Sequence, residues 1–331
     1  MTSLEEEFYR DIRKHREDDM PRLVLADWLD EQGDEVSCAR AELIRVQCRL
    51  AQLPAEEEVL RPQLVRQEGL LQDQLTDWLT PVQQRCTSFE LRRGLIEEIT
   101  VQPHQLLGDG EALLELAPVA ELVLSAQRQE WEPICACPAL RAVTRLEGRG
   151  GVGDEGMRAL ADSPHTGRLR ALLLHHSSIT EEGFADLLRL DLSQLTHLNL
   201  GANNLHDTGM EMLCFSAMLT GLRYLSLGAN ELYGRSARAL AESPYLYRLD
   251  EINLGANYLD DTALGLIAEA PHLASLRILD VRSNEFGMRG AEALAQSPHL
   301  EHLTSLDASG NKFGARGAAL LRRRFGGRVN L

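Results

Sequence analysis

Long hydrophobic runs are absent from this sequence of 331 residues. No stretch approaches the roughly 18 uninterrupted apolar residues that a membrane-spanning helix needs, so we expect no membrane contact. The first residues, Met1–Glu7, lack the basic start and the apolar run of a secretory signal. The cysteines are scattered, which predicts reduced thiols and a cytoplasmic location; they occupy positions 38, 48, 86, 135, 137 and 214.

Basic charge is also scarce. Lysine occurs only at Lys14 and Lys312, and the formal net charge is -16. An acidic protein repels the phosphate backbone of nucleic acids unless a local basic patch overrides its field. The basic run Arg322-Arg323-Arg324 is predicted to end the last helix, where positive charge is favoured by the helix dipole. We therefore expect no nucleic-acid partner.

The sequence lacks the common catalytic motifs. It contains no Gly-x-Ser-x-Gly, no phosphate loop of the Gly-x4-Gly-Lys-Ser/Thr type and no His-Glu-x-x-His. The glycine-rich stretch Gly148–Gly153 is predicted to lie in the turn of a repeat, and not after a strand that opens a dinucleotide-binding fold. We expect no enzymatic activity and no cofactor.

Metal-ligand patterns are absent as well. Cys135-Ala136-Cys137 and His175-His176 fit neither the Cys-x-x-Cys nor the His-x3-His spacing of standard zinc sites. The acids of residues 27–34 do not have the spacing of a calcium loop. We expect no metal ion.

What the sequence does contain is an internal repeat. Five segments align without a gap on the pattern Leu-x-x-Leu-x-Leu-x-x-Asn-x-Leu, and the first runs from Leu195 to Leu205. A sixth copy with Ser177 in the asparagine position precedes them at a step of 26 residues. The asparagines recur at a constant step of 27 residues, as Asn203, Asn230, Asn257, Asn284 and Asn311.

This repeat predicts its own structure. Each copy should form a short parallel strand, a turn, a helix and a returning loop. The alternating apolar residues of the strand, such as Ile252 and Leu254, should point inward onto helix residues such as Ala239-Leu240. A single copy cannot bury its apolar face, so the copies must stack.

The pattern resembles the leucine-rich repeat, and its period and helical half resemble the ribonuclease-inhibitor subclass. The resemblance implies an α/β solenoid with parallel strands on the concave face and helices on the convex face. We predict regular repeats over residues 169–331, with Arg328–Leu331 as a capping strand. Degenerate leading repeats are expected over residues 89–168, with strands at 94–101, 119–124 and 139–146, the last out of register, and helices at 105–117 and 152–161.

Residues 1–80 are predicted to form a small all-α domain, because they show helical spacing and no repeat. The expected helices are 5–16, 20–31, 39–52 and 56–79. The run Asp18–Asp34, continued by Ala41–Cys48, resembles the bacterial repeat-companion domain, a helical module found ahead of leucine-rich and other repeats. Arg93–Val101 and the ending Arg324–Leu331 are similar to the same family. The resemblance implies no biochemical activity.

The repeat asparagines are predicted to be structural. In this repeat type, the buried asparagine side chain bonds backbone groups of its own and adjacent turns. A buried amide without partners would cost about 1–3 kcal/mol, so the position and the role agree. We therefore exclude these five residues from the candidate binding site.

The concave strand face is the candidate binding site, since its side chains are polar and mildly acidic, with Tyr224 as an aromatic anchor. Six strands roughly 4.8 Å apart would extend over about 25–30 Å, which suits a protein footprint of about 800 Å². The predicted contact residues are His175, His197, Asn199, Tyr224, Ser226, Glu251, Asn253, Asp280, Arg282 and Asp307.

The leading hypothesis is therefore a non-catalytic scaffold that binds a protein partner on the concave face. The alternative is a regulatory or catalytic protein, for example GTPase-activator-like, whose N-terminal helical domain acts on a target recruited by the repeats. The ribonuclease-inhibitor-like subclass includes GTPase activators, and the resemblance implies that Arg282 or an exposed asparagine could stabilise phosphoryl transfer in a partner. A third hypothesis is an adaptor whose helical domain binds and whose repeats are spacers. The sequence indicates neither the partner nor the oligomeric state.

Overall fold

The computed structural model describes residues 3–55 and 57–331. Met1, Thr2 and Glu56, the first residue of the predicted fourth helix, lie outside the described residues. The chain divides into two compact units. The N-terminal unit comprises 1–125 and 137–143, and the C-terminal unit comprises 126–136 and 144–331. The three predicted domains, which had other boundaries, stay a prediction.

Helices begin the N-terminal unit, with five in the described residues where four are expected. The fourth predicted helix divides in two at Leu75. Helix α2 ends at Gly33, whose φ of 74° is a left-handed conformation that favours glycine. The Asp34 side chain accepts a hydrogen bond from the Ser37 N–H at 2.9 Å, so α3 begins ahead of the predicted Ala39. The helices are α1 (Ser3–Lys14), α2 (Met20–Gln32), α3 (Glu35–Gln52), α4 (Leu60–Gln74) and α5 (Thr76–Gln83).

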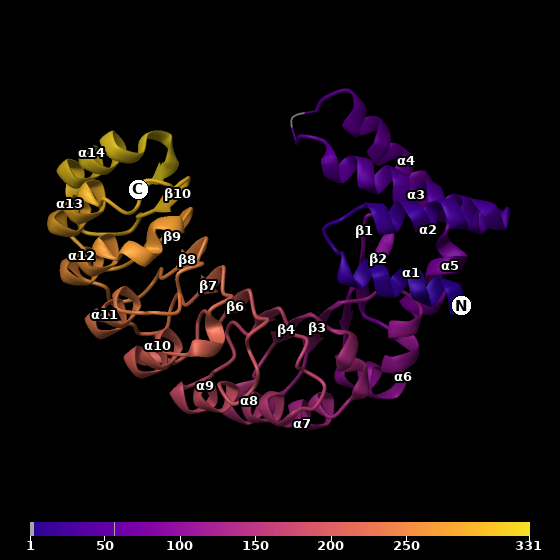
Figure 1. The fold of residues 1–331 in the computed structure, drawn as a ribbon, viewed down its shortest axis with the longest axis horizontal. Helices are drawn as coiled ribbons and strands as arrows, with labels where there is room; N and C mark the ends of the chain where they lie inside the picture. The colour runs from indigo at the N-terminus through magenta and orange to yellow at the C-terminus, as the bar shows by residue number, and fades with distance from the viewer. Residues whose placement is uncertain (1–2, 56) are drawn as a thin grey trace. The chain divides into compact units, whose positions relative to one another are not determined.

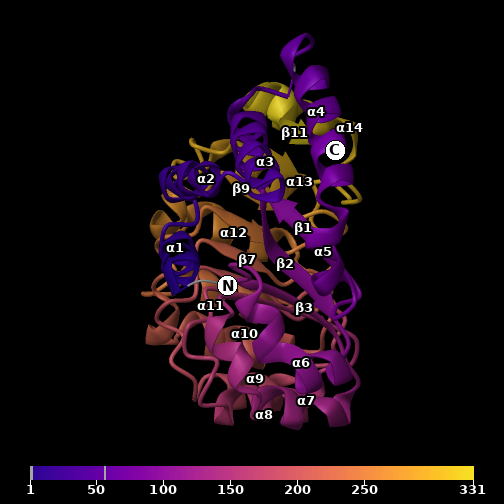
Figure 2. The same cartoon turned by 90° about the vertical axis from the view of Figure 1, so that its right-hand side faces the viewer.

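Helix α3 is the centre of this helical part, because it packs against α2 on one side and against α4 on the other (Figure 2). Ala41 and Ile44 face a core shared with α1 and α2. Leu43 and Val46 face a second core shared with α4. A helix that is apolar on two faces must be covered on both, which explains why the helices on either side of α3 are needed.

An antiparallel hairpin of β1 (Ser88–Arg92) and β2 (Leu95–Val101) follows the helices. Its turn lies against α3, since a Cβ on Gly94 would be 2.3 Å from the Ile44 Cα. The Gly94 N–H donates to the Gln47 side chain at 2.6 Å. The predicted strand at 94–101 is confirmed, but its antiparallel partner differs from the parallel leading repeat expected to begin at residue 89.

A buried ion pair also joins the hairpin to α2. Arg22 is fully buried, and its Nε donates to Glu97 Oε1 at 3.0 Å. From the hairpin turn, Arg93 donates to the Arg16 carbonyl at 2.8 Å and contacts Asp19 at 2.9 Å. A buried charge is tolerated only with a partner. Two of the stretches that carry the companion-domain resemblance, 18–34 and 93–101, therefore meet in the fold.

The N-terminal unit ends with parallel pairing. Helix α6 (Pro103–Glu115) leads from β2 to β3 (Glu121–Ser125), which lies parallel to β2. The helix predicted at 105–117 and the strand predicted at 119–124 are thus present with shifted ends. A short 3-10 helix, Pro138–Ala142, packs against α6.

The C-terminal unit consists of parallel strands joined by helices, and each strand pairs with the next along the chain. In Figure 1, the strands lie on the inner side of the curve of this unit and the helices on its outer side. Its elements are α7 (Trp131–Cys135), β4 (Arg145–Arg149), α8 (Gly153–Asp162), β5 (Ala171–Leu173), α9 (Glu181–Leu187), β6 (His197–Asn199), α10 (His206–Cys214), β7 (Tyr224–Ser226), α11 (Gly234–Ala241), β8 (Glu251–Asn253), α12 (Asp261–Glu269), β9 (Ile278–Asp280), α13 (Met288–Gln296), β10 (Ser305–Asp307), α14 (Gly314–Phe325) and β11 (Val329–Asn330).

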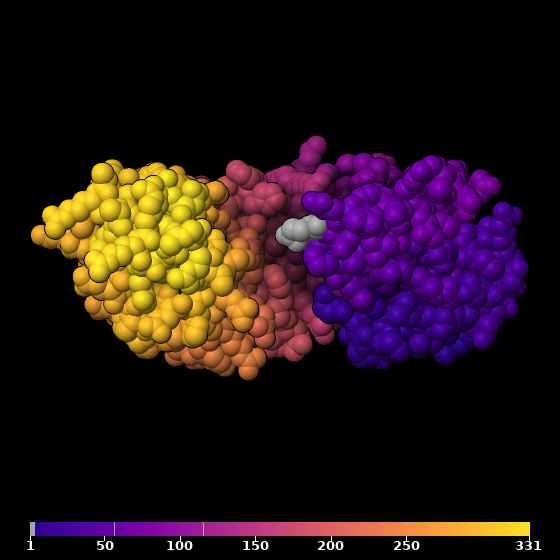
Figure 3. All heavy atoms as spheres, turned by 90° about the horizontal axis from the view of Figure 1, so that it is seen from above, coloured from indigo at the N-terminus to yellow at the C-terminus, as the bar shows by residue number. Residues whose placement is uncertain are grey.

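The register of these strands follows the repeat. The second residue of each strand is buried and pairs with the second residue of the next. The row from β4 to β10 is Leu146, Leu172, Leu198, Leu225, Ile252, Leu279 and Leu306. The predicted capping strand is confirmed, since β11 pairs in parallel with β10. Together with α14 it forms the end of the unit, coloured yellow in Figure 3.

Strand β4 corrects the sequence-based prediction. Residues 138–142 form a 3-10 helix, so the strand expected at 139–146 is misplaced, and β4 is in register, with Leu146 paired to Leu172. This copy has Gly148 where the next has Leu174. The fully buried Trp131 fills the space of the missing side chain, because a Cβ on Gly148 would lie 2.9 Å from its ring. The leucine pattern is therefore broken in sequence while the core stays filled.

The repeat asparagines join successive turns. The Asn257 side chain donates to the carbonyls of Leu227 and Leu254 at 3.1 and 3.0 Å. Its oxygen accepts from the N–H groups of Asn230 and Leu232 at 2.9 and 3.1 Å. Each such amide satisfies backbone groups of its own repeat and of the preceding one. Because those backbone groups are buried, loss of the asparagine amide would leave them without hydrogen-bond partners and would lower the stability of the protein.

Replacement of Leu254 by Ala tests the strand register. Leu254 is 2% exposed, so the shorter side chain should leave a core cavity that lowers the free energy of unfolding by about 2–5 kcal/mol. Ile278→Ala, at an outward position of β9 that is 36% exposed, is the control and should cost about 1 kcal/mol or less. Chemical denaturation followed by circular dichroism measures both. A loss below about 0.5 kcal/mol for Leu254→Ala would contradict the register.

Trp131 occupies the space that a repeat leucine fills in the next copy. The losses of stability caused by substitutions at Trp131 and at Gly148 should therefore not be additive. Gly148→Leu should destabilise the protein by about 1–3 kcal/mol, because the new side chain meets Trp131. Trp131→Ala should cost about 3–5 kcal/mol through the cavity it leaves. In the double variant, the leucine enters that cavity, so its loss should be smaller than the sum of the two single losses. If denaturation shows that the two losses of stability are strictly additive, Trp131 does not fill the space of the missing leucine.

Candidate functional site

Two rows of outward side chains cross strands β5–β10, and we call these rows the strand face. Because the strands are parallel and in register, equivalent residues are neighbours roughly 4.8 Å apart. The first row is Ala171, His197, Tyr224, Glu251, Ile278 and Ser305. The second row is Leu173, Asn199, Ser226, Asn253, Asp280 and Asp307.

An aromatic pair occupies the middle of the first row. The His197 and Tyr224 rings stack with centroids 5.8 Å apart and planes inclined at 23°. The Thr196 hydroxyl lies 2.9 Å from His197 Nδ1 and fixes the ring. Partial burial lowers the pKa of His197, and the positive charges of Arg145 and Arg223 lower it further. The histidine is therefore neutral at pH 7, and the pair offers an uncharged, half-buried aromatic surface.

Carboxylates follow the aromatic pair along the strand face. Partial burial raises the pKa of Glu251, and the negative charge of Asp280 raises it further. Burial also raises the pKa of Asp280, although the Arg282 N–H donates to this carboxylate at 3.0 Å. Burial alone would raise the pKa of Asp307 too, but hydrogen bonds from Ser309 hold it below its usual value. This end of the strand face is thus negatively charged at neutral pH.

A shallow hollow of about 350 Å³ lies beside the second row. His175 and His176 line it on the side of β5, and Arg282 lines it on the side of β9. Its floor is the backbone of Gly201, Gly228 and Gly255. A Cβ on Gly255 would lie 3.0 Å from the Arg282 Cγ, so a larger residue at this position would crowd the arginine and fill part of the hollow. Three more predicted residues line the hollow: Asn199, Ser226 and Asn253.

The structure therefore places all ten predicted contact residues on one strip of the C-terminal unit. His197, Tyr224 and Glu251 belong to the first row, and Arg282 and His175 flank the hollow. The remaining five belong to the second row. Their contact with a partner stays a prediction.

Two further residues of the second row were missed from sequence. Glu147 of β4 pairs with Leu173, and Asn330 of β11 pairs with Asp307, to which its amide donates at 3.0 Å. The misplaced strand at 139–146 concealed Glu147. The step of 26 residues that separates Leu173 from Glu147 was the signal that could have found it.

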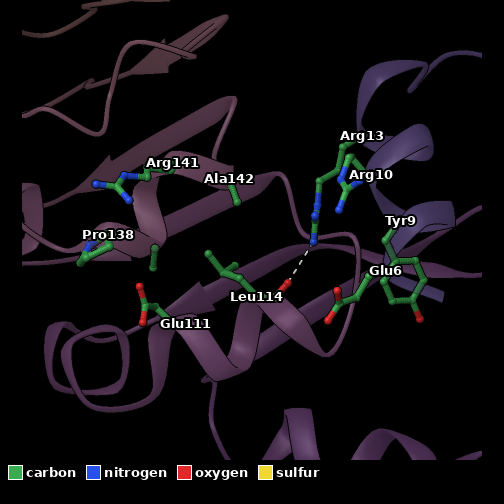
Figure 4. A pocket seen from close by; sticks show the side chains of 10 residues that line it. Glu6, Tyr9, Arg10, Arg13, Glu111, Leu114, Pro138, Arg141 and Ala142 are labelled. Carbon is green, nitrogen blue, oxygen red and sulfur yellow. Dashed lines mark hydrogen bonds between the residues drawn. The ribbon is translucent and has the colours of Figure 1, made fainter. Parts of the chain in front are cut away.

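Two further hollows lie in the N-terminal unit. One, of about 560 Å³, is lined by charged residues that include Arg61, Glu68 and Arg92. The other, of about 370 Å³, lies between α1, α6 and the 3-10 helix Pro138–Ala142. Figure 4 shows Arg10 and Arg141 on its walls and Arg13 reaching across, where its Nη2 donates to the Leu114 carbonyl at 3.0 Å. Burial raises the pKa of Tyr9, so its hydroxyl stays protonated and does not act as a base at neutral pH. The hollow thus presents arginine side chains, one of which caps the end of α6.

Thiol and metal chemistry find little support in the described residues. Burial raises the pKa of Cys48 and of Cys135 to about 12, so both thiols are protonated at neutral pH. Within residues 3–55 and 57–331, no three or more His, Cys, Asp or Glu side chains come together as a possible metal site. In the same ranges, no helix combines the length and the apolar character required to cross a bilayer.

Comparison with known families agrees with this geometry. Residues 191–214, 272–295 and 299–321 match the family model described as a leucine rich repeat. These three segments of the C-terminal half are therefore similar to leucine-rich repeats. Stacked repeats generally form extended concave surfaces that are used for binding. No curated protein matches the chain.

Substitution of Glu251 by Gln should change how stability depends on pH. The raised pKa means that folded Glu251 binds its proton more tightly than the unfolded chain does, whose value is near 4.5. Wild-type stability, relative to Glu251→Gln, should therefore fall as the pH rises through and above about 4.5. Denaturation of both proteins at several pH values between about 4 and 7 measures the difference. A difference that is constant, or that moves in favour of the wild type, would contradict the assigned direction.

Proposed function

We propose that the protein is a non-catalytic scaffold whose C-terminal unit, a ribonuclease-inhibitor-like leucine-rich-repeat solenoid, binds a protein partner on the strand face. The observation that carries this proposal is the pair of in-register rows on β5–β10, whose side chains from β6 to β10 are exposed or half-buried except for Ser226. Six strands at roughly 4.8 Å cover a length that matches one side of an ordinary protein interface.

The chemistry of the strand face indicates what kind of partner surface it fits. The neutral His197–Tyr224 stack can accept an apolar or aromatic side chain, since aromatic anchors carry much of the energy of interfaces. The carboxylates of Glu251 and Asp280 favour a basic group beside that anchor. The complementary surface thus has an apolar centre with positive charge on the side that faces β8 and β9.

The N-terminal unit is proposed to contain a repeat-companion domain. Support comes from the contact between its two characteristic stretches, in which Arg22 of α2 pairs with Glu97 of β2. The cysteines support a cytoplasmic location, because all six are unpaired, as expected in a reducing compartment.

In the GTPase-activator-like alternative, Arg282 or an exposed asparagine of the repeats is a possible contact to the partner's phosphate. The Arg282 Nε lies 3.4 Å from Asp280 Oδ2, so a neighbouring carboxylate already balances part of its charge. An arginine that stabilises phosphoryl transfer must bring positive charge to the partner's phosphate. This alternative stays a prediction.

Affinity capture with strand-face variants tests the proposed function. Full-length wild type, a Tyr224→Ala/Glu251→Gln variant and an Arg238→Ala/Glu242→Ala control on the outward-facing helix α11 are used as bait, and captured proteins are identified by mass spectrometry. A partner should bind to the wild type and the control and be reduced at least about tenfold on the strand-face variant, a loss of about 1.4 kcal/mol. Thermal unfolding should show that all three baits are folded. Capture that is equal on all three would contradict the proposal.

A further inference from the structure

Two exposed tyrosines stack on each other away from the strand face. Tyr233 and Tyr258 are 48% and 46% exposed, and their ring centroids lie 4.9 Å apart with planes inclined at 13°. Both belong to the turns that lead from a strand to a helix: Tyr233 directly precedes α11, and Tyr258 lies shortly before α12. A pair of large aromatic rings held in contact and left open to solvent is unusual on a surface that contacts nothing.

The backbone holds these rings in place. The Tyr233 N–H donates to the Asp207 carboxylate at 2.9 Å, and the same carboxylate accepts from the Ser236 N–H at 3.1 Å. The Tyr258 N–H donates to the Leu232 carbonyl at 2.9 Å. Because both main chains are fixed to neighbouring repeats, the rings are already ordered, and a ligand would lose little affinity in ordering them.

Acidic side chains surround the tyrosine pair. The residue after each repeat asparagine is exposed, and in three successive repeats it is Glu231, Tyr258 and Glu285. We call Tyr233 and these three residues the turn edge. Desolvation raises the pKa of Tyr233, and the neighbouring Tyr258 and the negative charges of Glu231, Asp207 and Glu285 raise it further.

The basic groups near the turn edge are held only by exposed contacts. The Lys312 ammonium lies 3.5 Å from Glu285, and the His206 ring lies 3.5 Å from Glu231, with all four side chains largely exposed. Exposed pairs of this kind contribute only about 0–1 kcal/mol and exchange readily for another partner. A ligand cation can therefore replace them.

We propose that the turn edge is a second docking surface, which binds an arginine-bearing basic segment of a protein partner. A planar guanidinium stacks on an aromatic face and donates to a carboxylate at the same time. The tyrosine pair supplies the face, and Glu231 and Glu285 supply carboxylates on either side of Tyr258. The proposal goes beyond the strand face, because it concerns a different surface of the same repeats.

The negative charge of the chain favours a basic peptide segment on the turn edge over a second copy of the chain or a nucleic acid. The chain carries a net charge of -16, so a second copy would bring acid against acid at this edge. Nucleic acids are disfavoured for the same reason. A basic peptide segment is attracted both by the local carboxylates and by the field of the whole chain.

The test uses a fluorescein-labelled peptide of alternating glycine and arginine and a matched peptide with citrulline in place of arginine, which keeps the shape and removes the charge. Fluorescence anisotropy measures the binding of each to the full-length chain. The arginine peptide should bind at least about tenfold more tightly than the citrulline peptide, since the cation supplies both the stacking and the ionic contact. Equal affinities would overturn the proposal.

Variants locate the binding on the chain. Tyr233→Ala/Tyr258→Ala should weaken binding of the arginine peptide about tenfold or more, and Tyr233→Phe/Tyr258→Phe should retain it, because the rings remain. Tyr247→Ala is the matched control: Tyr247 is 47% exposed, lies away from the turn edge, and its loss should change the affinity less than about twofold. Equal losses for Tyr247→Ala and the double alanine variant would mean non-specific attraction and would overturn the proposal.

The strand-face variant Tyr224→Ala/Glu251→Gln separates this proposal from the proposed function. Peptide binding should weaken much less in that variant than in Tyr233→Ala/Tyr258→Ala, because the turn edge stays intact and only one strand-face charge is removed. If the peptide were lost there and kept by Tyr233→Ala/Tyr258→Ala, the basic segment would bind the strand face, and the turn-edge proposal would be overturned while the scaffold function stood. Circular dichroism of every variant checks that the fold is intact.

Discussion

Side-chain amides at the ends of strands β6–β10 are the constraint on which the regular repeats of the C-terminal unit depend. After each of these strands the chain turns towards a helix, and carbonyls such as those of Leu227 and Leu254 would be buried without a partner in the sheet. The amide of Asn257 reaches both, and its oxygen accepts from the preceding repeat. Asn203 makes the equivalent bonds to the repeat of β5, although that repeat is one residue shorter. The amides therefore fix how neighbouring turns stack, and the step of 27 residues recurs from Asn203 to Asn311.

A second set of contacts supports the same stacking from the helix side. Asp154, Asp207 and Asp261 each accept hydrogen bonds from backbone groups at the start of the next repeat's helix. Ser243 and Ser297 each directly precede a proline. Their hydroxyls donate to carbonyls at the end of the helix of the previous repeat, Cys214 of α10 and Ala268 of α12. Strand ends, helix starts and helix ends are therefore all tied between neighbours. The outward positions of the strands and turns take no part in these bonds and are free to vary.

Local and periodic signals in the sequence predicted much of this fold. The asparagine step predicted the register, and the leucines predicted the buried row, because both features recur wherever the same contact recurs. Strand β4 was misplaced because its contact is made by other means: Gly148 leaves a space that Trp131, distant in sequence, occupies. The β1–β2 hairpin was missed for a similar reason, since the approach of Gly94 to Ile44 depends on tertiary packing that no short pattern encodes.

The same distinction applies to the candidate surfaces. The strand face could be located from sequence, because outward positions alternate with buried ones in every copy. Its aromatic stack and its shallow hollow could not, since they depend on ring orientation and on glycine backbone. The turn edge was invisible to the repeat alignment, because Tyr233 lies three residues after its asparagine and Tyr258 only one. Equivalent positions are compared in an alignment of repeats, whereas this pair joins two positions that are not equivalent.

Charge connects the two surfaces. Glu231 and Glu285 lie on the turn edge, and Glu251 and Asp280 lie on the strand face of the same few repeats. The pKa of Glu251 is raised by burial and further by the negative charge of Asp280. A basic partner on either surface adds positive charge to these repeats, and each binding event then makes the other surface less negative. Two basic partners would consequently compete weakly through the field of the repeats, even though they touch different residues, and the competition would fade as salt screens the field over about 10 Å at 0.1 M ionic strength.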